Sequence, residues 1–180
     1  MAGEAGDPNA RPLRGRLARL WRHAWARKRT VGRIFDQAAL AQIEAAIAEG
    51  ERDHLGEIRF AVETDLGPFA ILAGTTPRQR ALQVFSEHRI WDTEHNSGVL
   101  IYLLWADHAV EIVADRAAHR ALAQADWDRI CAMLAASCRA GRPVSGAVAA
   151  IREANAALAR TLAVADRDNP DELSNRPLRL

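Results

Sequence analysis

The sequence predicts an α/β protein, a three-layer α/β/α sandwich in which helices cover both faces of a small mixed central sheet. Three strand-like segments support this prediction. Residues 57–63, EIRFAVE, alternate apolar and polar side chains, which is typical of a strand with one well buried face. Residues 99–105, VLIYLLW, are apolar at nearly every position, which is typical of a strand covered on both faces. Residues 109–115, AVEIVAD, follow after a tight turn as the third strand.

The connections between these segments predict how the strands are arranged. Thr76 followed by Pro77 marks the start of a helix, because the hydroxyl can accept a hydrogen bond from an unpaired amide and proline suits the first turn. A helix between two strands makes a right-handed crossover, so the first two strands should be parallel. A tight turn joins the second and third strands, so these should form an antiparallel hairpin. Other helices are expected over 36–52 (capped by Asp36), 116–122, 126–141 (capped by Asp126) and 143–162.

The composition of the 180 residues indicates one globular domain with an appendage at each end, since 49% hydrophobic residues can bury a substantial core. Residues 1–33 contain nine Arg or Lys and two acidic residues, whereas residues 34–180 contain fifteen Arg and twenty-one acidic residues. We therefore expect a basic, partly disordered arm at 1–33, an α/β domain at 34–164 and a disordered tail at 165–180, which is rich in Asp, Asn and Pro.

The cysteines and the N-terminus bear on the cellular compartment. Cys131 and Cys138 are seven residues apart on one expected helix, which places their Cα atoms roughly 10 Å apart, too far for a disulfide. Two buried thiols suit a reducing compartment. No apolar segment resembles a signal-peptide core or approaches the length of ~20 residues that spans a bilayer. These features predict a cytoplasmic location.

The basic arm contains an expected amphipathic helix over residues 13–28. Trp21 and Trp25 lie on its apolar side, and Arg14 and Arg22 lie on its other faces. This combination is typical of a helix on an anionic membrane surface, which predicts a peripheral position on the inner membrane or contact with a membrane protein. The alternatives are a helix that docks on the body of the protein or frays. Nucleic acid is not expected as a partner, because no aromatic stacking platform accompanies the charge.

A polar turn, residues 92–98, stands directly before the most apolar strand. If the strands run as predicted, this turn and the exit of the third strand lie at the same end of the sheet. Oxygen ligands in one place are what Ca²⁺ or Mg²⁺ requires. The candidate site residues are Asp92, Glu94, Asn96 and Asp115 for a metal ion, Arg89 and Arg116 for a phosphate or other anion, and His95 and His119 as accessory groups. The alternative is a solvated turn in which Asn96 and Gly98 allow the backbone conformation that the turn requires.

The same stretch resembles the TPM domain family, which occurs in thylakoid lumen proteins tied to photosystem repair and in bacterial proteins that are often secreted or membrane-anchored. The resemblance covers roughly residues 36–162. Its most specific part is Trp91, the polar turn, Asn-Ser-Gly-Val-Leu at 96–100 and the hairpin behind it. It implies an α/β sandwich with a small central sheet, binding of calcium or another divalent metal, and the acid phosphatase activity proposed for the plant branch. The chain departs from the family at 114–119, where many members have a glycine-rich segment and this sequence reads ADRAAH.

Together these observations predict a TPM-type binding module that holds a divalent cation and associates peripherally with a membrane. A short member of this kind is expected to lack the signal peptide and membrane tail of many bacterial relatives. One alternative is a metal-assisted acid phosphatase that uses the same pocket, and another is a protein–protein scaffold. Phosphate-binding glycine loops and the HExxH, GxSxG and CxxC motifs are absent from the sequence, so no motif specifies a reaction.

Overall fold

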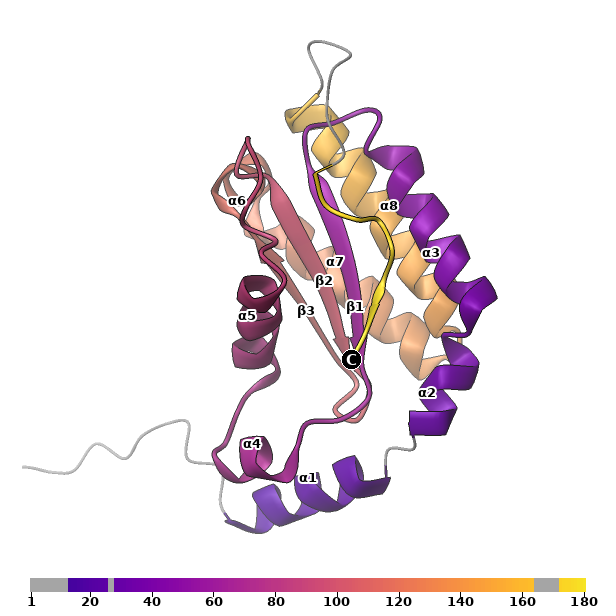
Figure 1. Cartoon of the computed structure of the whole chain (residues 1–180), viewed down its shortest axis with the longest axis vertical. Coiled ribbons are helices and arrows are strands. Elements are labelled where there is room, and N and C mark those ends of the chain that lie inside the picture. The colour runs from indigo at the N-terminus through magenta and orange to yellow at the C-terminus, as the bar shows by residue number, and fades with distance from the viewer. Residues whose placement is uncertain (1–12, 26–27, 164–171) are drawn as a thin grey trace, which may run out of the picture.

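Helices cover both faces of a four-stranded mixed sheet (Figure 1). The computed structural model describes residues 13–25, 28–163 and 172–180. The strand order is β3-β2-β1-β4, and the strands are β1 (Glu57–Glu63), β2 (Gly98–Leu104), β3 (Ala109–Ala114) and β4 (Leu178–Arg179). The prediction of a three-layer α/β sandwich is confirmed.

Most of the helices form the two outer layers. They are α1 (Leu13–Trp25), α2 (Lys28–Ile34), α3 (Gln37–Gly50), α4 (Pro68–Leu72), α5 (Pro77–Glu87), α6 (Arg116–Ala121), α7 (Gln124–Arg139) and α8 (Pro143–Thr161). On one face, α3, α7 and α8 pack against the larger hydrophobic cluster, which includes Ile43, Ile130 and Ile151. On the other face, α4 and α5 pack against a smaller cluster through Ile71 and Val84 (Figure 1).

Strand β2 lies at the centre of the sheet and is buried along its whole length. It pairs in parallel with β1, from Glu57 opposite Gly98 to Glu63 opposite Leu104, and antiparallel with β3, with Val99 opposite Ala114. Because side chains alternate across a strand, β2 contributes to both hydrophobic clusters. The predicted parallel crossover and antiparallel hairpin are both confirmed.

The helix starts show which capping predictions are right. The Thr76 hydroxyl accepts from the backbone N–H of Gln79 at 3.1 Å, and the Gln79 side chain accepts from the Thr76 N–H at 2.8 Å. Asp36 likewise caps α3 by accepting from the Ala39 N–H. The expected cap at Asp126 is wrong, because α7 already begins at Gln124. Asp126 instead lies in the first turn, where a carboxylate suits the positive end of the helix dipole.

Both expected domain boundaries shift. Val31, on α2, is fully buried in the larger hydrophobic cluster, so the domain begins before residue 34. The prediction of a disordered tail over 165–180 is wrong for its last residues, because β4 pairs in parallel with β1. The Leu180 N–H donates to the Val62 carbonyl at 2.9 Å, and Leu178 packs against the smaller cluster. The first part of that tail, 165–171, lies outside the described residues, as do positions 1–12 and 26–27 of the arm.

Cys131 and Cys138 lie on α7 and are both free thiols, as the sequence predicts. Burial, together with the negative charges of Glu111 and Asp128, raises the pKa of Cys131 to about 11. Burial also raises the pKa of Cys138. Both thiols are therefore protonated near neutral pH, when they are poor nucleophiles and poor metal ligands.

The first residue of β2, Gly98, explains the glycine of the Asn-x-Gly-Val-Leu motif in terms of packing. A Cβ atom at this position would lie 1.8 Å from the backbone oxygen of Ile90. The chain before the turn passes so close to the start of β2 that no side chain fits between them. At Gly67, by contrast, a Cβ atom would meet nothing within 4 Å.

We predict that Gly98→Ala lowers the free energy of unfolding by about 2 kcal/mol or more, because the backbone of Ile90 must move to admit the methyl group. Gly67→Ala is the matched control. It should change the stability by less than about 1 kcal/mol, because φ is −59° there and the gain from restricting the unfolded chain is offset by alanine being a poorer helix N-cap than glycine. Urea denaturation of both variants tests this, and equal stability of the two would contradict it.

Candidate functional site

The turn before β2 is held by its own hydrogen bonds. The Asn96 N–H donates to the Thr93 carbonyl at 3.1 Å, and the Ser97 N–H donates to the Thr93 hydroxyl at 3.0 Å. Arg89 and Asn96 have positive φ angles of 51° and 53°. Asparagine tolerates this left-handed conformation better than most residues, as the interpretation of Asn96 as a backbone-turning residue predicts.

The end of β3 meets this turn, as the strand directions predict. The Asp115 N–H donates to the Gly98 carbonyl at 2.8 Å, and the Ala117 N–H donates to the Asn96 carbonyl at 2.9 Å. The Arg116 guanidinium donates to the side-chain oxygen of Asn96 and lies 3.8 Å from a carboxylate oxygen of Asp115. Asn96, Asp115 and Arg116 are therefore neighbours.

Asp115 has one carboxylate oxygen engaged and one unpaired. Its Oδ1 atom accepts from the Arg116 N–H at 2.7 Å and so caps α6. Its Oδ2 atom is buried and has no hydrogen-bond partner within the described part of the chain, and the side chain is only 12% exposed. The hydroxyl of Ser97 in the same turn is also buried without a partner among the described residues. Buried polar atoms are usually paired, so these two oxygens are candidates for pairing with a water molecule or an ion.

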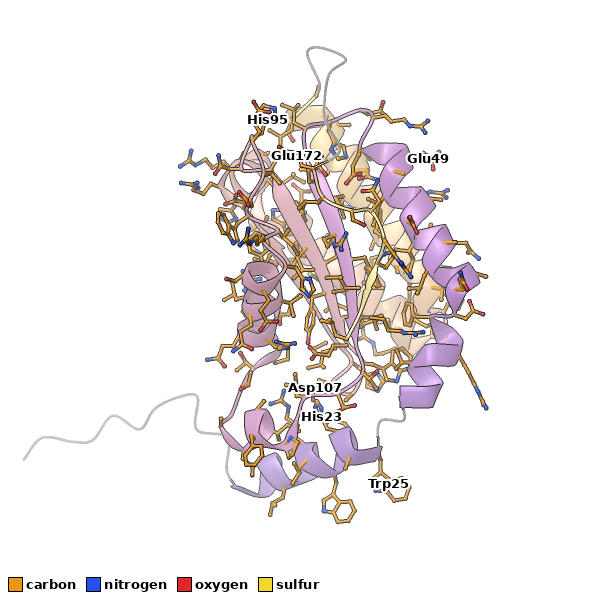
Figure 2. All side chains as sticks on the ribbon, viewed as in Figure 1. His23, Trp25, Glu49, His95, Asp107 and Glu172 are labelled. Carbon is orange, nitrogen blue, oxygen red and sulfur yellow. The ribbon has the colours of Figure 1, made fainter. Side chains whose placement is uncertain are left out.

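The remaining candidate residues are spread around this junction. Asp92, Glu94, His95 and Arg89 are exposed on the turn, and the Glu94 N–H donates to the carboxylate of Glu172 at 3.0 and 3.1 Å. Figure 2 shows His95 and Glu172 at the same end of the molecule. Within 13–25, 28–163 and 172–180, no group of three His, Cys, Asp or Glu side chains is placed to hold a metal ion. The expected ligands Asp92 and Glu94 thus have no described contact with Asn96 and Asp115.

His119 faces a different part of the surface. It is exposed and lines a cavity of about 300 Å³ together with Arg78, Trp127 and Asp128. This cavity lies against β3 and α7, and Asn96 and Asp115 do not line it. The His119 side chain therefore lines this cavity, while its backbone N–H donates to the Asp115 carbonyl at 2.7 Å.

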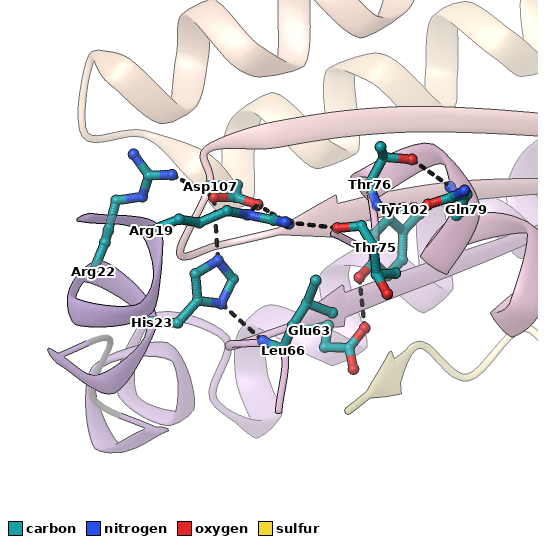
Figure 3. A network of polar contacts seen from close by, with 10 residues as sticks. All are labelled: Arg19, Arg22, His23, Glu63, Leu66, Thr75, Thr76, Gln79, Tyr102 and Asp107. Carbon is teal, nitrogen blue, oxygen red and sulfur yellow. Dashed lines mark hydrogen bonds and ion pairs between the residues drawn. The ribbon is translucent and has the colours of Figure 1, made fainter. Parts of the chain in front are cut away.

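A second polar cluster, which the sequence did not disclose, lies at the opposite end of the sheet. Asp107, in the turn between β2 and β3, accepts from Arg19 at 2.6 and 2.8 Å, from Arg22 at 2.6 Å and lies 3.1 Å from the Nε2 atom of His23 (Figure 3). The Nδ1 atom of His23 accepts from the Leu66 N–H at 2.8 Å. We call Arg19, His23 and Asp107 the clasp, because these buried side chains fasten α1 to the hairpin.

The clasp changes the ionisation of Asp107. Burial alone would raise the pKa of this carboxyl group, but the hydrogen bonds and charge of Arg19, the nearby His23 ring and the hydrogen bond from Arg22 outweigh burial. The pKa of Asp107 is therefore lowered to about 2 from its ordinary value of 3.8. The sequence contained one signal for the clasp: Arg19 and His23 are four residues apart and so lie on one face of the helix.

The clasp also decides which side of α1 faces the solvent. Because Arg19 and His23 point inward, Trp21 and Trp25 are exposed, and Figure 2 shows Trp25 directed away from the body of the protein. Arg22 is about half exposed. The side chain of Arg14, which was expected on the same surface, lies outside the described part of the structure.

A buried network lies beneath the clasp. The Tyr102 hydroxyl donates to the Glu63 carboxylate at 2.5 Å (Figure 3). Arg80 donates to the same carboxylate at 2.9 Å. Burial and the neighbouring negative charge of Glu63 raise the pKa of Tyr102 far above its ordinary value. The phenol therefore stays neutral and acts as a hydrogen-bond donor that holds Glu63 in place.

Comparison with known proteins agrees with this architecture. The family model described as the TPM domain matches residues 31–157. The chain belongs to the TPM domain family. Its structure is similar to the NMR structure of the BA42 protein from the psychrophilic bacterium Bizionia argentinensis, with a TM-score of 0.71 and 26% sequence identity over 81% of this chain and 94% of BA42. None of the curated proteins matches the chain.

The TPM domain identified from residues 36–162 is thus confirmed, and the matched region also takes in the second half of α2. In the described ranges, each helix is too short or too polar to cross a lipid bilayer.

The clasp gives a pH-dependent prediction. Asp107→Asn should lower the free energy of unfolding at pH 7 by about 2 kcal/mol, because hydrogen bonds to a charged group are lost. Since the folded pKa of Asp107 is lowered, its contribution is present above the unfolded pKa of 3.8 and is lost as the pH falls towards about 2. The difference between the wild-type protein and the variant should therefore shrink below pH 3.8.

Urea denaturation across this pH range measures that difference. Asp53→Asn, at an exposed position, is the control and should match the wild-type protein at every pH. A stability difference for Asp107→Asn that is the same at neutral and at acid pH would contradict the assignment.

Proposed function

We propose that this TPM domain is a binding module that holds a hard divalent cation, Ca²⁺ or Mg²⁺, at the Asn96–Asp115 junction. The observation that carries this proposal is the buried Oδ2 atom of Asp115, which has no hydrogen-bond partner within the described part of the chain. A buried carboxylate oxygen without a donor is costly, and a cation is one of the few ligands that would offset this cost.

The residues present fit such an ion. Asp115 would supply a carboxylate and Asn96 a side-chain carbonyl oxygen, and both are hard oxygen ligands. Mg²⁺ keeps several of its waters and is commonly held by only one or two carboxylates, so a cluster of three acidic side chains is not required. Asp92 and Glu94, exposed on the same turn, would add negative charge nearby. The bound ion would neutralise Asp115 and join the turn to the end of β3.

Arg116 is expected to compete with the cation. Its guanidinium is bonded to the side-chain oxygen of Asn96 and lies near Asp115, so it stands where the ion would bind. The Arg116 side chain is 74% exposed and can therefore turn away into solvent at little cost. The arginine and the cation would be alternative partners of the same oxygens.

The same contacts favour binding over the phosphatase alternative. Arg116 was a candidate for holding a phosphate, but in the structure it lies 3.8 Å from the Asp115 carboxylate, whose negative charge disfavours an anion at this place. Arg89 is exposed at the other end of the turn. We therefore propose binding without turnover.

Titration calorimetry on the whole chain tests the cation site. Asp115→Asn should weaken binding of Ca²⁺ or Mg²⁺ by at least about tenfold, because the carboxylate that is the proposed charged ligand of the ion is removed. Asparagine is also a good helix cap, so α6 should remain intact. Arg116→Gln should strengthen binding by about threefold, because a competing positive charge is removed.

The control for these variants is Asp53→Asn, which removes one exposed negative charge elsewhere. It should bind the ion as the wild-type protein does. Absence of heat with both ions, or equal affinity of the wild-type protein and Asp115→Asn, would refute the proposed site.

A further inference from the structure

We propose that α1 and α4 together form a surface that lies against an anionic membrane. This α1–α4 surface consists of Leu17, Trp21, Trp25, Phe69 and Leu72, all of which are exposed. The inference does not depend on the cation site, which lies at the other end of the sheet.

The first argument is the orientation of α1. A surface helix normally buries its apolar side and exposes its charges. Here Arg19 and His23 are buried against Asp107, Thr75 and Leu66, whereas Trp21 is 66% and Trp25 is 69% exposed. Leu17, Trp21 and Trp25 are spaced four residues apart and so form one stripe along the helix. The polar contacts of Arg19 and His23 thus hold the apolar stripe outward.

The second argument is the contribution of α4. This helix is anchored by Ile71, which is buried in the smaller hydrophobic cluster, and it packs beside α1. Phe69 on α4 is 86% exposed, and Leu72 is half exposed. Among the described side chains, five of the eight large hydrophobic residues that are exposed belong to these two helices, and the others, Leu82, Trp91 and Leu180, lie on other elements. Exposed apolar side chains concentrated on two packed helices indicate an interaction surface.

The third argument is charge. Neither α1 nor α4 contains an acidic residue, and Arg22, which also pairs with Asp107, is half exposed on the same helix as the tryptophans. Residues 1–33 as a whole carry nine basic and two acidic residues, although the rest of the chain is acidic. Tryptophan and arginine side by side suit the boundary between lipid headgroups and acyl chains, where the indole ring is amphipathic and the cation meets anionic headgroups. This complementarity favours an anionic bilayer as the partner.

The fourth argument is geometry. Figure 1 shows α1 lying crosswise at one end of the molecule, with the strands running away from it. A helix of 13 residues is about 20 Å long, so the stripe can lie flat on a membrane along its whole length. Because the clasp already fixes α1, the tryptophans are presented without further ordering of the helix on binding.

Co-sedimentation of the whole chain with vesicles tests the proposal. The wild-type protein should sediment with vesicles of phosphatidylcholine and phosphatidylglycerol but much less with phosphatidylcholine alone. The double variant Trp21→Ala, Trp25→Ala should lose at least about tenfold in partitioning, since each aromatic side chain buried in lipid is worth that much or more. Arg22→Gln and added salt should each weaken binding to the anionic vesicles.

Trp91→Ala is the matched control. Trp91 is also about half exposed, but it lies beside the turn before β2 and not on the α1–α4 surface. This variant should bind vesicles as the wild-type protein does, and circular dichroism should show that all variants are folded. Binding in the presence of a chelator, and by Asp115→Asn, should be unchanged, which separates this test from that of the cation site.

Three outcomes would overturn the proposal. The wild-type protein could remain in the supernatant with anionic vesicles, or bind neutral vesicles equally well. The double tryptophan variant could bind as tightly as the wild-type protein. Finally, the chain could stay off the vesicles and self-associate in a way that the double variant abolishes, which would make the α1–α4 surface a protein interface.

Discussion

The position of β2 is the constraint on which the rest of the structure depends. All seven residues of this strand are buried, and both of its edges are paired. A strand with no exposed face requires helices on both sides, so the two hydrophobic clusters and the two helical layers follow from it. Its rigid ends also fix where the irregular polar segments can lie. The Asn96–Asp115 junction stands at its beginning and Asp107 just beyond its end.

Each end of the sheet has a buried carboxylate, and the two carboxylates differ in how their charge is compensated. At one end, the carboxylate of Asp107 is buried and receives hydrogen bonds from Arg19 and Arg22, so its charge is compensated within the chain. At the other end, Asp115 is nearly as buried but keeps one oxygen unpaired within the described residues. The first carboxylate orients a helix, whereas the second is suited to a ligand from outside. The Asp107 end of the sheet is thus a structural region, and the Asp115 end is the proposed binding region.

Local patterns predicted most of the fold. Three patterns, each only a few residues long, led to the correct strand pairing. They are the apolar–polar alternation in 57–63, the helix start at Thr76-Pro77 and the apolar run of β2. The meeting of Asn96 with Asp115 followed from strand direction alone. The orientation of α1 could not be predicted, because it depends on Asp107, 88 residues from Arg19 in the chain. Strand β4 could not be predicted either, because it is two residues long and exists only through pairing with β1. The positions of Asp92 and Glu94 depend on an irregular turn without a repeating geometry.

The short strand β4 has a consequence for how the protein avoids aggregation. The outer edge of β1 would otherwise present unpaired backbone groups of a highly buried strand, which is a template for pairing with another molecule. The C-terminal residues cover this edge, with Leu180 bonded to Val62 and the Leu173 N–H donating to Glu57. On the opposite edge, the Ile112 carbonyl of β3 receives the Arg78 guanidinium. The outer edge of β1 and one carbonyl on the edge of β3 are thus occupied by the protein's own chain, which leaves fewer backbone groups free for pairing with a second molecule.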